Sequence, residues 1–400
     1  MVEQDSDAAA PAPEPGRDRT RAFSITQGPL LRLLRRFHLT RVDGSARAGP
    51  VVAITWGPLA GGALVCAAAG WPPAPFLHDL SVHARLLIVV PLLLQAERIL
   101  DQRCRSVIDQ LYAGQFAERA ALDRILDRAE RLRDSRRVVL AFAAFALLGG
   151  LALQWGFNGL IGVFTRSAIA GGWSFGHLWY SFVAWPIAQL LILRWLWHWV
   201  IWSYIAVRLS RLPLATIAIH PDHAAGIGFL EEPIHGFAGF VLALSVLVAA
   251  AWETQILDGR ASLHTFVPEF AAFLVVAAVL ACGPLLLFVG MLYRARRRDI
   301  ISYNELALDY VRSFHRKWIE ARSEHEELLG TADLQSLHDL CGAYDDMVKT
   351  RLVPLSPRTL VALFVAAVVP MLPLVVTAMP FKDLLQRLLH VLLGTLPGAG

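Results

Sequence analysis

Apolar residues gather in blocks of about 20 positions, the length at which a helix crosses a hydrocarbon core of about 30 Å. The blocks are continuous rather than alternating, so they predict helices and not the strands of a membrane barrel. We expect seven membrane-spanning helices, at residues 50–70, 82–100, 138–156, 179–205, 234–253, 267–292 and 358–378. The second is the weakest, because its uninterrupted apolar core, 86–96, contains Pro91. The last opens at Ser356-Pro357, a helix cap followed by proline at the first helical position.

Arginine positions predict how these spans are oriented. The chain before the first span and the segments 98–137 and 293–357 are rich in arginine, whereas 71–81 has no Arg or Lys and 157–178 has only Arg166. Rich and poor segments alternate along the whole chain, and positively charged loops stay in the cytoplasm. We therefore expect a cytoplasmic N-terminus and a periplasmic or external C-terminus, in a bacterial inner membrane.

Polar segments complete the expected domain organisation. The two arginine-rich internal segments repeat apolar residues every three to four positions, which predicts amphipathic helices. We expect these helices to pack together as a cytoplasmic bundle that extends the second and sixth spans. The expected parts are a disordered tail at 1–28, a basic amphipathic surface segment at 29–49, a transmembrane domain at 50–380 with cytoplasmic helical insertions at 98–137 and 295–357, and an amphipathic C-terminal segment at 381–400.

Composition agrees with an all-α membrane protein. Hydrophobic residues make up 56% of the chain, charged residues 18%, and the mean hydropathy is +0.49, whereas soluble proteins have about 25% charged residues. The net charge of +4 comes from arginines beside apolar blocks, so it favours membrane orientation over nucleic-acid binding. The 4 cysteines show no CxxC or Cys/His spacing, so neither a disulfide framework nor a zinc site is predicted. We expect no cofactor.

The loop after the fourth span is the first candidate site. It contains His220, Asp222 and His223, which could handle protons or bind a metal, and Gly226 and Gly228, which allow close backbone approach or positive φ. The simplest interpretation is a structured turn in which Asp222 caps the helix that follows. A proton or anion site is the second interpretation. A metal site is the third, because three potential ligands within four residues are weak evidence for a metal.

Arg194 is the second candidate, because a charge in the middle of a span costs about 2.5–3.5 kcal/mol or more unless it is paired or hydrated. Its expected partner is Glu97 at the cytoplasmic end of the second span, and His198 lies one turn further on the same face. Three interpretations stay open: a buried structural pair with Glu97, an arginine that reaches the cytoplasmic interface with local thinning of the bilayer, and a transport role.

Catalytic motifs are absent: the sequence has no Walker loop, no HExxH and no Ser/His/Asp order typical of hydrolases. An enzyme is therefore the least favoured class. We expect a non-enzymatic protein that binds or scaffolds a partner, or self-associates, through its cytoplasmic helices. The alternative is a small-solute or ion transporter or channel with a site near the His220 loop and Arg194.

Scattered motifs also give the chain a family resemblance. They are Trp56-Gly-Pro58, Arg85 with Pro91 and Glu97, Arg194-Trp-Leu-Trp197, the His220-Pro-Asp loop through Leu230, Lys317-Trp318, and Gly330-Thr-Ala-Asp-Leu-Gln-Ser336 with Asp339-Leu340. In these residues the chain resembles a family of uncharacterised multi-pass bacterial membrane proteins with a His-Pro-Asp-x-Ala-Gly-Gly-like loop. The chain departs from that loop by having Ala225 where the family pattern has glycine. The resemblance implies the topology and the importance of the loop, and implies nothing about a substrate.

Overall fold

The computed structural model describes residues 23–29, 32, 47–70, 79–154, 175–320 and 332–378. About 83% of the described residues are helical, and the described part contains no strands, which confirms the all-α class. Within the described residues, 5 helices are long and apolar enough to cross a membrane. They are Leu80–Ala113, Phe175–Leu209, Gly228–Leu257, Leu263–Leu286 and Pro357–Val375.

A sixth span would be the bent pair α3 (Ala48–Thr55) and α4 (Gly57–Ala68), whose axes differ by 41°. The expected third span, 138–156, begins in α8 (Arg136–Gln154) and ends outside the described residues, and it is not among these helices. Seven spans therefore stay a prediction. The expected C-terminal segment, 381–400, also lies outside the described residues.

Two spans contain a π-helical turn directly before a proline. In the first, α5 (Leu80–His83) leads through the π turn η2 (Ala84–Val89) into α6 (Val90–Ala113), whose second residue is Pro91. In the second, α9 (Phe175–Trp179) leads through the π turn η4 (Tyr180–Ala184) into α10 (Trp185–Leu209), whose second residue is Pro186. Proline lacks an N–H and clashes with the carbonyl four residues earlier, so a wider turn lets the helix continue. Pro91 therefore does not end the second span.

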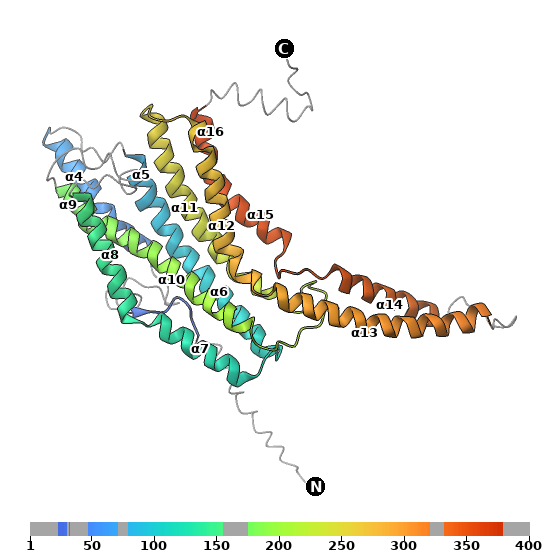
Figure 1. Cartoon of the computed structure of the whole chain (residues 1–400). Helices are drawn as coiled ribbons and strands as arrows, with labels where there is room; N and C mark the ends of the chain where they lie inside the picture. Colours follow the sequence, from blue (N-terminus) through green and yellow to red (C-terminus); the bar gives the residue numbers. More distant parts are fainter. Residues whose placement is uncertain are drawn as a thin grey trace, which may run out of the picture.

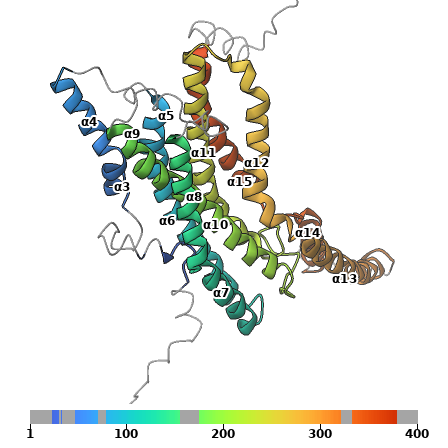
Figure 2. The same ribbon diagram turned by 60° about the vertical axis from the view of Figure 1, so that its left-hand side comes forward.

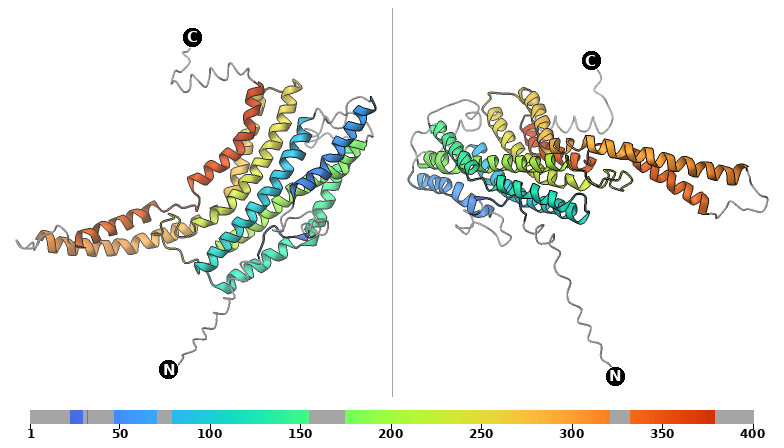
Figure 3. Two further views of the ribbon diagram at one scale, coloured as in Figure 1. Left: turned by 180° about the vertical axis from the view of Figure 1, so that it is seen from behind. Right: turned by 60° about the horizontal axis from the view of Figure 1, so that its bottom comes forward.

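The centre of the molecule is the contact between α6 and α11 (Glu232–Leu257), which lie side by side in Figures 1 and 3. Gly236 and Gly239 of α11 allow this close approach. A Cβ added at Gly236 would lie 2.7 Å from Leu100 Cα, and one at Gly239 would lie 2.6 Å from Ala96 Cβ. Small residues at helix contacts are a common way to associate helices in membranes. Beside this contact, the ring of Trp195 stacks on Phe240 with centroids 5.2 Å apart.

The chain changes direction sharply after α12 (Val267–Leu286), as Figure 1 shows. Pro284 lies inside this helix, so the carbonyl of Leu280 four residues earlier loses its helical donor. The indole N–H of Trp199, on α10, donates to that carbonyl instead, at 2.5 Å. The next helix, α13 (Val289–His315), leaves in a new direction.

Helix α13 and the π turn η7 (Arg316–Glu320) form a long hairpin with α14 (Ala332–Lys349), which extends sideways from the other helices (Figures 1, 2 and 3). Lys317 Nζ and the indole N–H of Trp318 donate to the Asp333 carboxylate at 2.7 and 3.1 Å. These two hydrogen bonds lower the pKa of Asp333. These contacts join the two legs near the tip of the hairpin.

The two arginine-rich insertions were expected to form one bundle, and the described helices are arranged differently. Helix α7 (Arg119–Arg133), in the first insertion, packs on α10, whereas α13 packs on α14. Apolar periodicity identified each helix correctly, but it could not tell which partner each helix has.

The expected disordered tail, 1–28, was placed too far along the chain. Residues 1–22 lie outside the described residues, but Phe23, Ser24 and Ile25 are buried. Ser24 Oγ donates to the Asp101 carboxylate at 2.5 Å, and Arg133 Nη1 donates to the Ser24 carbonyl at 2.5 Å. We call residues 23–29 the N-terminal strap. Of the expected surface segment, 29–49, only residues 29, 32 and 47–49 are described.

Candidate functional site

The Asp222 carboxylate organises the loop between α10 and α11. Its Oδ1 accepts the backbone N–H groups of Ala224 and Gly226 at 2.8 and 3.0 Å, and its Oδ2 accepts that of Gly228 at 2.8 Å. Burial acts to raise the pKa of Asp222, but these three amides, together with nearby His220, lower it overall. Gly228 is the first residue of the 3-10 helix η5 (Gly228–Glu231), so Asp222 does cap that helix, from six residues upstream.

Two glycines and one alanine permit the tight path of this loop. Gly226 has φ +86, and a Cβ added there would lie 3.3 Å from the Phe116 ring. A Cβ at Gly228 would lie 2.9 Å from Asp222 Oδ2. Ala225 has φ 55 and is fully buried. That value lies in the left-handed region that non-glycine residues can reach at a cost, so alanine is tolerated at position 225.

The two histidines differ in their surroundings. His220 is half exposed, and its Nδ1 lies 3.0 Å from Asp222 Oδ1 and 3.3 Å from the Asp222 backbone nitrogen. His223 has φ 51, and its buried Nδ1 has no hydrogen-bond partner within the described part of the chain. Across the described residues, no group of three His, Cys, Asp or Glu side chains is arranged to hold a metal.

The loop joins the base of the hairpin to the membrane-spanning helices. On the α13 side, the Ala218 N–H donates to the Asp299 carboxylate at 2.7 Å, and Arg298 Nη2 donates to the Thr216 carbonyl at 2.8 Å. At the other leg of the hairpin, Thr350 Oγ1 donates to the Ala218 carbonyl at 2.8 Å. The 216–218 segment is thus hydrogen-bonded to both legs of the hairpin.

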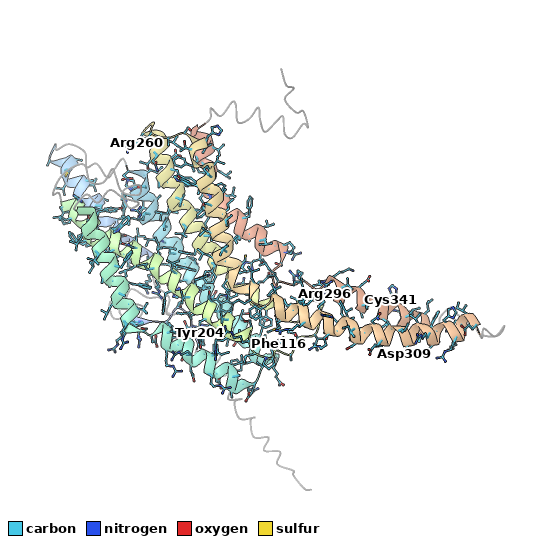
Figure 4. All side chains as sticks on the ribbon, viewed as in Figure 1. Phe116, Tyr204, Arg260, Arg296, Asp309 and Cys341 are labelled. Atoms are coloured by element: carbon cyan, nitrogen blue, oxygen red, sulfur yellow. The ribbon has the colours of Figure 1, made fainter. Side chains whose placement is uncertain are left out.

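Arg351, just after α14, fastens the second half of the loop. Its backbone N–H donates to the His223 carbonyl at 2.7 Å, and its Nη2 donates to the Asp222 carbonyl at 2.7 Å. On the opposite side, the Phe116 ring lies 5.4 Å from the Phe229 ring, between centroids. Figure 4 places Phe116 and Arg296 toward the same end of the molecule, with Arg260 at the other end.

Comparisons with protein families, curated proteins and solved structures find no match to this chain. The site is therefore interpreted from its own geometry.

The structure brings together the second pair of candidates. Arg194 Nε lies 3.3 Å from Glu97 Oε1, and only 10% and 7% of the two side chains are exposed. Arg194 Nη2 also donates to the Thr26 carbonyl of the N-terminal strap, at 2.6 Å. Because the charge of the guanidinium is paired in place with Glu97, Arg194 has no need to reach the interface. This geometry matches the interpretation as a buried structural pair.

The two candidate clusters are held by different elements. Fifteen residues of α10 separate Arg194 from Leu209, which is about 22 Å of helix at 1.5 Å per residue. Arg194 is bound by α6 and the strap, whereas the His220 loop is bound by the hairpin base and the α6–α7 turn. The clusters therefore form two sites and not one.

Several buried polar residues were not predicted from the sequence. Asp299, Thr350 and Arg351 lie 81 to 132 residues from their partners in the loop. A second intramembrane charge, Arg85, is 3% exposed; its side chain donates to Tyr180 Oη and lies 4.4 Å from the Trp185 ring centroid. The signal for Arg85 was available, because a charge inside a span is a candidate by default.

Proposed function

We propose that this chain is a non-enzymatic protein of a bacterial inner membrane that binds a partner protein through its α13–α14 hairpin, held on the cytoplasmic side. The observation that carries the proposal is an exposed apolar stripe along α13 and η7. Four large aliphatic side chains, each 46% to 64% exposed, form it: Ile301, Leu308, Val311 and Ile319. We call these residues the α13 stripe.

The stripe lies on a different face of α13 from its contact with α14. At 100° per residue along α13, Leu308 falls within about 20° of Ile301 and Val311 within about 80° of it. Tyr310, whose hydroxyl donates to the Asp333 carbonyl of the α14 leg at 2.9 Å, lies on another face. Exposed apolar surface of this kind on an element outside the membrane is typical of a protein contact.

Arginines at the hairpin base favour a protein over a nucleic acid as partner. Arg296 Nη2 donates to the Val348 carbonyl, and Arg298 is bonded to Asp299 and to the Thr216 carbonyl. These guanidinium groups join the hairpin legs to each other and to the loop, so they are not arranged as a free phosphate-binding row.

The alternative function is a permeation pathway near the His220 loop and Arg194, and the geometry supports it less well. Both Asp222 oxygens accept backbone amides, and Arg194 is paired with Glu97. Between the two clusters the α6–α11 contact is close packed around Gly236 and Gly239.

Photo-crosslinking in native membranes tests the proposal. The photoreactive amino acid p-benzoylphenylalanine replaces Leu308 in the stripe or, as a matched control, the exposed neighbour Asp309, about 100° away on the same helix. We expect a discrete adduct from position 308 and none from 309. Ile301→Glu should reduce the adduct from position 308 severalfold.

The mass of the adduct decides what occupies the stripe. A mass of twice the chain would make the partner a second copy, and any other protein mass would identify a foreign partner. Equal adducts from 308 and 309, no adduct at all, or adducts of lipid mass only would overturn the proposal.

A further inference from the structure

A pocket of about 240 Å³ lies where α8 runs alongside α10 under the N-terminal strap. One wall is the strap, from Thr26 to Pro29. The remaining lining is mostly apolar, with a few polar side chains; its chief members are Val139, Phe142, Leu190, Arg194, Trp197 and His198. For comparison, an engineered apolar cavity of about 150 Å³ binds benzene. This pocket is large enough for part of a hydrocarbon chain.

Two buried polar atoms on its lining residues lack partners. Arg194 uses Nε for Glu97 and Nη2 for the Thr26 carbonyl, and its Nη1 has no hydrogen-bond partner among the described residues. The same holds for Nδ1 of His198, one turn further along α10. Arg194 is 8% exposed and His198 is 3% exposed. A buried donor without an acceptor costs about 1–3 kcal/mol, so an oxygen atom bound there would be stabilised.

The apolar part of the pocket is continuous with a surface suited to lipid. Helix α8 exposes Leu140, Phe145 and Leu148 by 69%, 55% and 62%, and on the neighbouring positions Val139, Phe142 and Ala143 line the pocket. Arg133 lies at the end of the pocket near the start of α8, followed by Arg136 and Arg137. Arginines at this level are typical of the interface where lipid head groups lie.

We propose that this pocket binds a fatty acyl group, with the acyl chain against Phe142 and Leu190 and its carbonyl oxygen accepting from Arg194 Nη1. Because Glu97 already balances the charge of Arg194, the ligand oxygen accepts a hydrogen bond and need not neutralise a charge. A carboxylic acid and an ester both meet this requirement. The acyl group therefore comes from a free fatty acid or from a phospholipid.

Bromine quenching of tryptophan fluorescence tests this proposal on the full-length purified chain. The chain has 12 tryptophans, and Trp197 is the one among the described residues that lines the pocket. Subtracting the signal of a Trp197→Phe variant isolates the contribution of Trp197 from that of the others. The probes are 9,10-dibromostearic acid, added to protein in detergent, and dibromo-phosphatidylglycerol, added in mixed micelles. Saturable quenching by the first probe alone identifies a fatty acid, and by the second alone a phospholipid.

Matched substitutions on α8 decide whether the quencher sits in this pocket. Ala143→Phe fills the pocket, whereas Ala144→Phe adds the same ring on the exposed neighbouring position. We expect at least a tenfold loss of probe affinity for Ala143→Phe and less than a twofold change for Ala144→Phe, with equal melting temperatures. Quenching that is absent for both probes, unsaturable, or equal in the two variants would overturn the proposal.

Discussion

Arg194 and Glu97 form a buried ion pair whose contribution to stability can be measured directly. Removing one partner of a buried pair leaves an unpaired charge and typically costs about 3–5 kcal/mol, whereas removing both avoids the orphan. We expect Arg194→Leu and Glu97→Gln each to lower the detergent melting temperature, and the double variant to recover part of the loss. The measurement is a thermal melt of the three purified variants.

An exposed pair in the same chain supplies the control. Arg260 and Asp258 lie 3.2 Å apart with 54% and 42% of their side chains exposed, and such pairs contribute about 0–1 kcal/mol. Arg260→Leu should therefore change the melting temperature little. Additive losses from Arg194→Leu and Glu97→Gln would contradict the pairing.

Asp222 offers a second prediction at the residue scale. Asparagine can cap a helix as well as aspartate, so the sequence alone suggests that Asp222→Asn is mild. In the structure both oxygens accept N–H groups, and an asparagine NH₂ would face the Gly228 or the Ala224 donor. We expect a loss of about 1–3 kcal/mol in the free energy of unfolding, whereas half-exposed His220→Gln should be nearly silent. A silent Asp222→Asn in the same thermal melts would contradict this arrangement.

The same carboxylate predicts a pH dependence. The folded pKa of Asp222 lies below its ordinary value of 3.8, so its contribution to stability is fully present above that value and is lost as the pH falls through the folded pKa. The difference in melting temperature between the wild type and Asp222→Asn should therefore shrink as the pH is lowered below 3.8. A difference that stays constant down to pH 2 would contradict the assignment.

At the scale of the element, Pro284 and Trp199 are linked through one carbonyl. Trp199→Phe removes the donor to Leu280, and an unsatisfied carbonyl inside a membrane is costly. Pro284→Ala restores a backbone N–H four residues after Leu280. We expect Trp199→Phe to lower the melting temperature and Pro284→Ala to recover most of the loss in the double variant.

The control for this pair is Trp197→Phe, two residues earlier on α10. The indole of Trp197 makes no hydrogen bond among the described residues, so this variant removes the indole without freeing a carbonyl. Pro284→Ala should not rescue any loss it causes. Rescue of both tryptophan variants alike would mean that Pro284 acts on general helix stability and not on the Leu280 carbonyl.

The sequence predicted single elements well where one local signal determines them. Helix α15 (Pro357–Val368) begins as expected, with Ser356 Oγ accepting the Thr359 N–H. The contacts that join elements were not predicted: Arg351 and its acceptor Asp222 are 129 residues apart, and nothing in the sequence around Arg351 links it to the loop. The strap was missed for another reason: Phe23 and Ile25 are too few apolar residues to signal burial next to a polar tail.

At the scale of the whole molecule, the expected topology can be tested on the two sides of α12. Cys341 is exposed on α14, and Arg260 lies at the opposite end of the molecule (Figure 4). In a chain with Cys66 and Cys282 replaced by serine, a membrane-impermeant maleimide should label Cys341 only in inverted vesicles. With Cys341 also replaced, Arg260→Cys should be labelled only in whole cells with a permeabilised outer membrane. Labelling of both from one side would mean that α12 does not cross.

The two π turns also bear on the direction in which the buried charges point around their helices. Glu97 and Arg194 both lie on the α-helical stretch that follows such a turn, 8 and 10 residues after its last residue. A π turn holds about one residue more than ordinary helix does for the same rotation, so deleting one residue from it would convert it to ordinary helix and leave the azimuth of everything downstream nearly unchanged. Deleting one residue from the α-helical stretch between the turn and Glu97 or Arg194 would instead rotate that charge by about 100° relative to what precedes it. The first deletion should therefore preserve the ion pair, whereas the second, only a few residues away, would turn one charge away from its partner with its chemistry unchanged.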